Sequence, residues 1–477
     1  MLFNSIEYIF IFLPIVFIVY FLLNKFKLYK TSRFFLLLSS LYFYGSYKWE
    51  YVPIIVCSIL FNYFISFVFK KDVSQTIKRN TLILGVFGNI FILLFFKYFN
   101  YLFETFKNIS LSPINAIEII IPLGISFFTL QQISYIVDCY KKDVEEYNLL
   151  DYALFVCFFP QLVAGPIVRH QEMIPQFRNI KNSVVNQDNI FIGIFLITIG
   201  LLKKTVFADG FVDFISFVNA REITDFINLS WTLGIAKVFQ GYFDFSGYCD
   251  MALGSAFLFN ISLPWNFNSP FKAESITDFW RRWNMTLMRF LRTYVYKPMG
   301  SDKKGELKTH FNILTVFIIM GIWISANAVS ILYGLLNGIF ICVNRLWSKL
   351  NIKINKVLCI FLTFVSVVIS TQFIFAENLN TVIRHIQSMF YINSHFLDMY
   401  LKGFNLVFAL RPPHNAQLNI ILLVACFVVL FFGKNSTQLA RDYVKANNTF
   451  YTFILVLVFI FSVLSITRST DFIYFIF

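Results

Sequence analysis

The stretch VLCIFLTFVSVVISTQFIFA, Val357–Ala376, decides the fold, because its twenty consecutive residues carry no charge and are mostly apolar. An α-helix of this length, rising roughly 1.5 Å per residue, crosses the roughly 30 Å hydrocarbon core of a bilayer. Similar runs recur along the whole chain, at Tyr8–Leu23, Thr81–Phe96, Ile421–Phe432 and Phe453–Leu464. The pattern predicts an all-α, polytopic membrane protein with about ten to twelve spans.

The composition agrees with a membrane protein and argues against a soluble one. Apolar residues make up 58% of the 477 residues and charged residues only 14%. The net charge of +14 does not indicate nucleic-acid binding, because the basic residues form short clusters between apolar runs. The first two clusters are Lys25, Lys27, Lys30 and Arg33, and then Lys70, Lys71, Lys78 and Arg79. Such clusters are typical of cytoplasmic loops, so we expect an extracytoplasmic N-terminus and a cytoplasmic loop at Lys141 and Lys142.

The middle of the chain has a different pattern. Between Pro122 and Gly338, Pro, Gly and ionisable residues enter segments at apparent membrane depth, as in PLGISFFTLQQISYIVD and GYFDFSGYCDMALG. Irregular backbone at that depth is tolerated only where it is buried in protein or lines a cavity. We therefore expect a single membrane-embedded domain over residues 1–477, with a functional core at about 122–338. The expected architecture is a helical bundle with a central funnel and re-entrant or interfacial helices.

One basic segment of this core reads SITDFWRRWNMTLMRFLRTYVYKPMG, Ser275–Gly300. Ser275 and Asp278 have the spacing of a helix start, and aromatic and apolar residues follow at helical intervals. The pattern predicts one amphipathic helix that ends at Pro298. Such a helix suits the anionic cytoplasmic interface, or it can pack its aromatic face against neighbouring spans, and the two placements are compatible.

Two carboxylates, Asp244 and Asp250, lie inside an apolar helical pattern. A charged side chain at membrane depth is costly unless it is paired or hydrated, so its presence favours a functional role. The alternative is that these aspartates pair with Arg281 or Arg282 and only hold the core together.

Several long motifs, in order, resemble a known family. They are the opening MLFNSIEYIFIFLPIVFIVYFLL, then PLGISFFTLQQISYIVD, GPIVRHQEMIPQF, KKTVFADG, FDFSGYCDMALG, LPWNFNSPFKAESITDFWRRWNMTLMRFLRTYVYKPMG and the terminal FIYFIF. Together they resemble the bacterial branch of the membrane-bound O-acyltransferases. That branch includes the alginate O-acetylation membrane protein and the D-alanyl transfer protein of teichoic acid.

The resemblance implies acyl transfer, with acetyl expected, from a cytoplasmic thioester to a hydroxyl of a cell-envelope polysaccharide. It implies acyl-CoA or an acyl carrier protein as donor, with no bound cofactor or metal, and a multi-pass location in the bacterial plasma membrane. An extracytoplasmic acyltransferase is the implied protein partner. The substrate-binding residues expected on this basis are Tyr248, Arg281, Arg282, Trp283 and Trp323.

The chain departs from the family at three histidines. The family has histidine at the end of a Trp-Arg-Arg-Trp-His motif, in a Trp-His-Gly motif, and in a Leu-His-Gly motif thirteen residues later. Here the three positions are Asn284, Ile324 and Asn337. Loss of a general base typically costs roughly 10²- to 10⁴-fold in rate. An asparagine amide can hydrogen-bond an oxyanion but cannot accept a proton at neutral pH, and isoleucine has no polar atom.

No other histidine is an evident replacement. His170 follows Arg169 in a Pro-rich motif and is expected in a loop, while His310 is expected at a helix start near the interface, roughly 21 Å along the helix axis from Ile324. The remaining three, His385, His395 and His414, are expected in loops or at helix ends.

Two hypotheses from different classes therefore remain. In the first, the protein is an enzyme that positions an acyl thioester, with Asn284 and Asn337 as hydrogen-bond donors and Asp244 or Asp250 as base. In the second, it is a non-catalytic descendant that serves as a scaffold, partner-binding protein or conduit. The histidine changes favour the second, and the retained FDFSGYCDMALG and SITDFWRRW favour a funnel that still holds a ligand. A transporter, the third possibility, has no support from the motifs.

Overall fold

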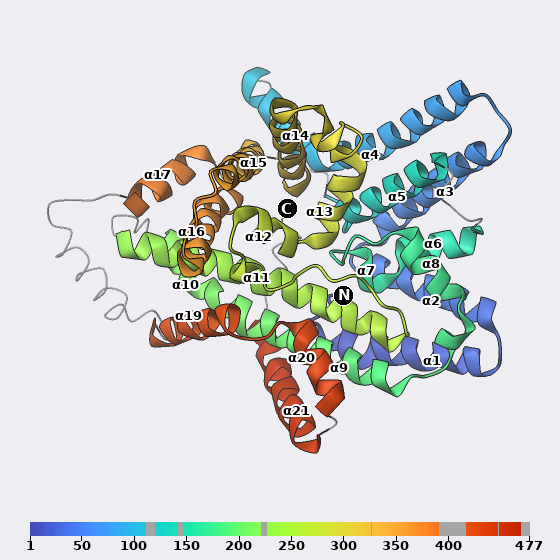
Figure 1. Ribbon diagram of the computed structural model, residues 1–477. Helices are drawn as coiled ribbons and strands as arrows, with labels where there is room; N and C mark the ends of the chain where they lie inside the picture. The colour runs from blue at the N-terminus through green and yellow to red at the C-terminus, as the bar shows by residue number, and fades with distance from the viewer. Residues whose placement is uncertain are drawn as a thin grey trace. The chain divides into compact units, whose positions relative to one another are not determined.

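The computed structural model describes residues 1–110, 120–141, 147–220, 227–325, 327–376, 378–390, 416–446 and 448–468. Throughout these residues the regular elements are helices, which confirms the all-α prediction (Figure 1). The terminal FIYFIF motif, Lys142, His395 and His414 lie outside the described residues.

Seven helices of the described residues are long and apolar enough to cross a membrane, or eight if a bent pair counts as one span. The seven are Tyr8–Lys25, Trp49–Lys70, Gln75–Asn100, Gln187–Ser216, Glu306–Ile324, Ala328–Lys349 and Lys356–Ile374. The number is smaller than the ten to twelve expected, because several apolar runs form short or broken helices. The run at Ile421–Phe432 belongs to the bent pair, whose two helices meet at 74° across a break.

The chain forms two compact units. Unit 1 comprises Met1–Thr198, Tyr248–Trp265 and Val444–Asn447, and unit 2 comprises Ile199–Gly247, Asn266–Tyr443 and Asn448–Phe477. Three helices, α9 (Gln187–Leu202), α11 (Ile227–Leu258) and α20 (Ser436–Ala446), contribute residues to both units. The expectation of a single domain over residues 1–477 stays a prediction.

Unit 1 holds the first eight helices. They are α1 (Leu13–Lys25), α2 (Tyr29–Gly45), α3 (Val52–Lys70), α4 (Gln75–Ser110), α5 (Ile125–Tyr140), α6 (Leu149–Cys157), α7 (Phe159–Leu162) and α8 (His170–Arg178). Figure 1 shows α3, α4 and α5 side by side. Asn62 of α3 donates to Asn89 of α4 at 3.1 Å and to Gln132 of α5 at 2.8 Å. Such amide bonds specify helix contacts in lipid, where apolar side chains alone discriminate poorly between helix and lipid tails.

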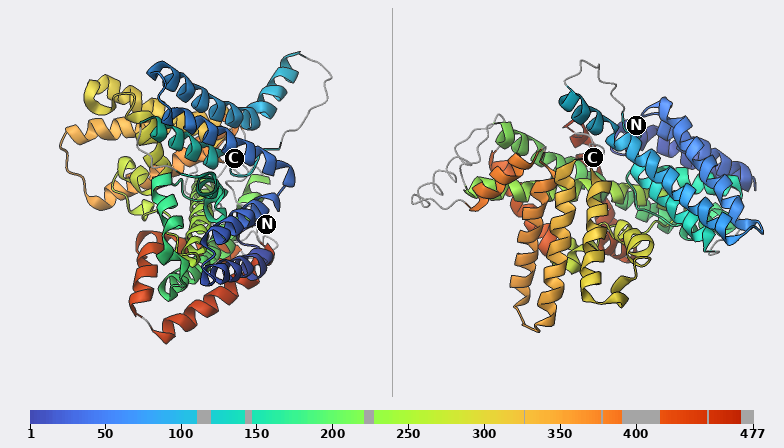
Figure 2. Two further views of the ribbon diagram at one scale, coloured as in Figure 1. Left: turned by 90° about the vertical axis from the view of Figure 1, so that its right-hand side faces the viewer. Right: turned by 90° about the horizontal axis from the view of Figure 1, so that it is seen from above.

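Unit 2 holds the later helices together with parts of α9 and α11. They are α10 (Val212–Ala220), α12 (Ile276–Arg282), α13 (Met285–Leu291), α14 (Glu306–Ile324), α15 (Ala328–Lys349), α16 (Lys356–Ile374), α17 (Leu379–Phe390), α19 (Ala416–Phe431), α20 (Ser436–Ala446) and α21 (Thr449–Leu464). The right-hand view of Figure 2 shows α14, α15 and α16 side by side as long neighbouring helices. Two of the three, α14 and α15, approach closely through glycines, because a Cβ on Gly334 would lie 2.1 Å from the carbonyl oxygen of Phe317.

The prediction of one helix from Ser275 to Pro298 is wrong. Its start is confirmed, because the Ser275 hydroxyl accepts the N–H of Asp278 at the N-cap of α12. The helix then stops at Arg282, and Asn284 adopts the left-handed conformation with φ 43° before α13 begins. The periodic aromatic pattern continues through this break, so it could not reveal the change of direction.

Candidate functional site

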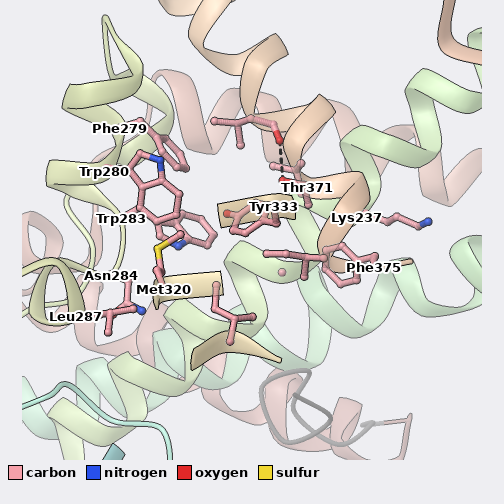
Figure 3. A pocket seen from close by; sticks show the side chains of 15 residues that line it. Lys237, Phe279, Trp280, Trp283, Asn284, Leu287, Met320, Tyr333, Thr371 and Phe375 are labelled. Atoms are coloured by element: carbon pink, nitrogen blue, oxygen red, sulfur yellow. Dashed lines mark hydrogen bonds between the residues drawn. The ribbon is translucent and has the colours of Figure 1, made fainter. Parts of the chain in front are cut away.

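A cavity in unit 2 lies among α11, α12, α13, α14, α15 and α16, and encloses about 60 Å³. Its lining residues are Lys237, Val238, Gly241, Phe279, Trp280, Trp283, Asn284, Leu287, Met320, Ile324, Tyr333, Val367, Thr371, Ile374 and Phe375. Figure 3 shows Asn284 and Leu287 at one end of the labelled side chains and Lys237 at the other. Four of these residues, from Val367 onward, lie beyond the core expected at 122–338.

Two of the three positions at which the family has histidine, Asn284 and Ile324, line this cavity. The third, Asn337, lies directly behind the wall, where its Oδ1 accepts a hydrogen bond of 3.2 Å from Nε1 of Trp280. Its Nδ2 donates to the carbonyl oxygen of Tyr333, one turn earlier in α15, at 2.9 Å. Asn337 therefore orients the ring of the lining residue Trp280, while its own amide is held by the backbone of α15.

The loop around Asn266 holds Asn284 in place. The carbonyl oxygen of Asn266 accepts the N–H of Met285 at 3.0 Å, and its Oδ1 accepts the hydroxyl of Thr286 at 2.6 Å. These bonds tie the residues after Asn284 to the chain before α12. Asn284 is 2% exposed, and its Oδ1 is buried without a hydrogen-bond partner among the described residues. A buried amide oxygen without a protein partner can accept a hydrogen bond from a ligand in the cavity.

Aromatic rings form much of the cavity wall around Asn284. Trp283 stacks on Phe279 with ring centroids 5.5 Å apart, and Trp280 meets Phe317 edge to face at 5.3 Å. Rings in these arrangements bury a large apolar area and are stiff. The wall therefore presents a stiff, largely apolar surface to the groups that the cavity holds.

The acidic candidates do not line the cavity. Asp244 accepts a hydrogen bond of 2.8 Å from Nζ of Lys204, which also lies 3.0 Å from Asp209. The pairing that we considered as an alternative role thus exists, but its cation is Lys204 of the KKTVFADG motif rather than Arg281 or Arg282. Asp250 is buried in unit 1.

The substrate-binding candidates are dispersed. Trp283 lines the cavity, whereas Arg281 is exposed and Arg282 pairs with Asp278 one turn earlier at 2.9 Å. Trp323 is buried in α14 but is not part of the lining. Tyr248 belongs to unit 1, where its ring stacks on Phe3 at 4.8 Å.

The expectation of a loop at His170 is wrong, because this residue begins α8 and is fully buried. Arg169 and Glu172 form a capping box at this helix start, a signal that the Pro-rich motif obscured. The ring nitrogens of His170 contact Asp138 and the Tyr147 hydroxyl, each at 3.2 Å. The ring is therefore engaged within unit 1.

His310 lies in the second turn of α14. The expectation of a loop or helix end at His385 is wrong, because this residue lies in the middle of α17. Neither is a lining residue of the cavity. Burial, together with the nearby charges of Lys237 and Arg384, lowers the pKa of His385 to about 4.

Sequence reasoning missed Lys237, a lining residue on α11 that is only 2% exposed. The available signal was a lysine inside the apolar stretch LGIAKVFQGYF, which the rule for ionisable residues at membrane depth marks as a functional candidate.

Comparison with known proteins identifies the family. The membrane-bound O-acyltransferase family model matches residues 128–383. The peptidoglycan O-acetyltransferase of Helicobacter pylori is 37% identical over 503 aligned positions, covering 97% of this chain and 95% of that protein. This chain belongs to the membrane-bound O-acyltransferase family. The match confirms the resemblance drawn from the motifs.

Other relatives in the family agree with the branch expected from the motifs. A probable alginate O-acetylase of Pseudomonas aeruginosa is 32% identical over 91% of this chain and 81% of its own length. The teichoic acid D-alanyltransferase of Bacillus subtilis is 29% identical over 48% of this chain and 60% of its own length. The apolar helices and these relatives make the protein a multi-pass membrane protein.

Proposed function

We propose that this member of the family holds the acetyl end of a cytoplasmic thioester in the unit 2 cavity. From there it presents the group to a hydroxyl of a cell-envelope polysaccharide. The positioning of the thioester and the hydroxyl, together with the amide of Asn284, takes the place of the family histidines. The observation that carries the proposal is the cavity itself, with Asn284 and Ile324 on its wall.

The size of the cavity favours a short acyl group. An apolar cavity of roughly 150 Å³ holds the six heavy atoms of benzene, so by proportion a cavity of about 60 Å³ admits roughly two to three heavy atoms. The cavity here encloses about 60 Å³, which matches an acetyl group and not a long acyl chain. Acetyl is also the group named in the two relatives that cover most of the chain.

The chemistry that the wall offers is positioning and hydrogen bonding. Holding a thioester and a hydroxyl in reacting geometry supplies a large part of the acceleration in acyl transfer. The Asn284 amide can donate to the oxyanion that develops when the hydroxyl attacks the thioester carbonyl. Acyl-CoA or an acyl carrier protein would be the donor, and a separate extracytoplasmic acyltransferase would be the partner, both by analogy with the family.

The test restores the histidines. The variant Asn284→His/Ile324→His/Asn337→His is reconstituted in lipid nanodiscs beside the parent chain and supplied with labelled acetyl-CoA and cell-envelope polysaccharide. We expect slow transfer by the parent chain, and transfer about 10²- to 10⁴-fold faster by the variant, because a general base contributes that much. The control is Lys353→His, which adds a histidine at an exposed residue between α15 and α16. Label that reaches the polysaccharide in neither chain would contradict the transfer role.

A second candidate function is a non-catalytic scaffold or partner-binding protein. One observation favours it, because the residues that line the cavity include no histidine and no carboxylate that could take the proton of the attacking hydroxyl. An unreactive triple-histidine variant together with stable capture of an extracytoplasmic acyltransferase by the parent chain would favour this second function.

A further inference from the structure

Tyr333 contributes a phenol hydroxyl to the wall of the unit 2 cavity. The residue belongs to α15, is 6% exposed and is one of the lining residues. Figure 3 shows the hydroxyl on the side of the ring that faces Trp280 and Trp283. Asn284 follows Trp283 directly in the chain and lines the same cavity. The phenol of α15 and the amide of Asn284 are therefore two polar groups on different walls of one small space.

Packing and hydrogen bonds fix the position of Tyr333. Its ring meets Trp280 edge to face, with ring centroids 6.3 Å apart. Its carbonyl oxygen accepts Nδ2 of Asn337 at 2.9 Å, and Oδ1 of Asn337 accepts Nε1 of Trp280 at 3.2 Å. The next residue, Gly334, packs against the backbone of α14 without room for a Cβ. A group held in this way is preorganised, so it can stabilise a charge without first having to reorient.

Two other polar side chains of the lining have their donors engaged within the wall. Nε1 of Trp280 donates to Asn337, and the hydroxyl of Thr371 donates to a carbonyl oxygen one turn earlier in α16 at 2.7 Å. Figure 3 draws the bond of Thr371 as a dashed line, and it shows the amine of Lys237 directed away from the two tryptophans. A phenol is more acidic than an aliphatic hydroxyl, so it makes the stronger hydrogen bond to a developing oxyanion.

The membrane face nearest to Tyr333 follows from the basic residues of α14, α15 and α16. Around the start of α14, at the end of α15 and around the start of α16 lie Lys303, Lys304, Lys308, Arg345, Lys349, Lys353 and Lys356. At the other ends of the same helices, residues 322–330 and 372–380 contain no lysine or arginine. Since cytoplasmic loops carry the excess of lysine and arginine, the ends without basic residues face the extracytoplasmic side.

Tyr333 lies near those ends, in the second turn of α15. Two further lining residues mark the same level, because Ile324 is the last residue of α14 and Ile374 is the last of α16. An acceptor hydroxyl from the extracytoplasmic side therefore approaches the cavity from the end at which Tyr333 lies. An acetyl carbonyl in the cavity is attacked there, within the space that the phenol borders.

We propose that the hydroxyl of Tyr333 donates a hydrogen bond to the carbonyl oxygen of the acetyl thioester and is, with Asn284, a catalytic residue of the transfer. The inference rests on the proposed function, because it takes the acetyl group as the occupant of the cavity. When the acceptor oxygen bonds to the carbonyl carbon, the carbonyl oxygen becomes negative and both donors stabilise it. The C–S bond then breaks as the carbonyl re-forms, and the proton of the acceptor hydroxyl leaves on the thiol. Tyr333 keeps its own proton throughout.

The first test detects the hydrogen bond itself and needs no transfer. Acetyl-CoA with an isotope label at its acetyl carbonyl is bound to the full chain in nanodiscs without acceptor, and isotope-edited infrared spectroscopy records the carbonyl stretching band. A hydrogen bond to a carbonyl oxygen lowers its stretching frequency, so we expect the band of Tyr333→Phe at a higher frequency than that of the parent chain. Thr371→Val removes a lining hydroxyl that donates within α16, and it should leave the band in place.

The second test separates a catalytic role from a structural one. Single-turnover transfer from acetyl-CoA to cell-envelope polysaccharide should have a maximal rate about 10²- to 10³-fold lower in Tyr333→Phe, because one oxyanion donor is lost. The acetyl-CoA concentration that gives half of this rate should stay within a few-fold of the parent value, since the ring is retained. A purely structural role predicts instead a lower unfolding temperature and weaker acetyl-CoA binding. The control Tyr451→Phe removes an exposed phenol of α21 and should change none of these quantities.

The outcomes distinguish a failure of this role from a failure of the proposed function. An unshifted carbonyl band in Tyr333→Phe, or an unchanged maximal rate of transfer, would overturn the role of Tyr333 and leave the proposed function standing. A shifted band in a parent chain that transfers no acetyl group would keep the hydrogen bond and overturn the transfer. A parent chain that binds no acetyl-CoA would overturn both.

Discussion

At the scale of single residues, the backbone of Asn284 explains how asparagine can stand where the family has histidine. Its φ of 43° lies in the left-handed region, which most side chains avoid. Asparagine and histidine are both enriched among the residues that tolerate this region. The exchange therefore changes the chemistry of the side chain while it preserves the break between α12 and α13. This compatibility is also why Asn284→His is expected to fold.

A prediction at this scale compares Asn284→Gly with Asn284→Ala. Both variants remove the amide, but only glycine adopts positive φ without steric cost. We expect the alanine variant to be less stable than the glycine variant by about 1 kcal/mol, because its Cβ is strained at this φ. Unfolding of the two reconstituted variants by heat measures the difference. Equal stability would mean that the backbone at residue 284 relaxes out of the left-handed region.

The identities of the site residues could be predicted from the sequence only in part. The motifs located Asn284 and Ile324, and both line the cavity. The left-handed turn could not be predicted, since a periodic aromatic pattern is the same whether a helix continues or restarts. Lys237 and His385 lie far apart in the sequence, and only the packing of α11 on α17 brings their side chains close together.

At the scale of helices, close contact between α14 and α15 sets the position of the cavity wall that carries Ile324 and Tyr333. A Cβ on Gly321 would lie 2.3 Å from the carbonyl oxygen of Ser330, and one on Gly334 would lie still closer to that of Phe317. Small residues that let backbones approach are the usual means of helix association in lipid. The apolar runs predicted that these helices exist, but not which faces they join.

The helix contact leads to a prediction about Gly334. Gly334→Ala should lower stability by about 1–3 kcal/mol, because its methyl group meets backbone that cannot rotate away. It should also weaken ligand binding, since α15 must move away from α14. Gly241→Ala is the matched control for stability alone, because Gly241 also lines the cavity, and its nearest neighbour at 3.3 Å is the ring of Phe375, a side chain that can shift. Thermal unfolding of both variants in nanodiscs provides the measurement. Equal losses would show that the α14 and α15 contact is not limiting.

At the scale of the whole molecule, hydropathy and basic clusters were sufficient for the fold class but not for the span count. An apolar run has the same composition whether it forms one span or a broken pair such as Ile421–Phe431 and Ser436–Ala446. The orientation of the helices in the membrane, in contrast, depends on loop charge. The signal for it is strongest where short loops differ most in charge. The connection between α14 and α15 lacks basic residues. In contrast, Lys353 lies in the connection between α15 and α16, and Lys356 is the first residue of α16.

The final prediction tests that orientation, on which access of an extracytoplasmic acceptor to the cavity depends. Single cysteines are placed at Ala328 and at Lys353, two exposed residues at opposite ends of α15 and its following loop, in a chain whose seven native cysteines are replaced. A membrane-impermeant maleimide added to intact spheroplasts should label Ala328→Cys and leave Lys353→Cys unlabelled, and permeabilisation should then allow both to react. This follows because loops rich in lysine and arginine remain on the cytoplasmic side of the membrane. The reverse pattern would place the cavity near the cytoplasmic face, and an extracytoplasmic saccharide acceptor would then have no direct route to it.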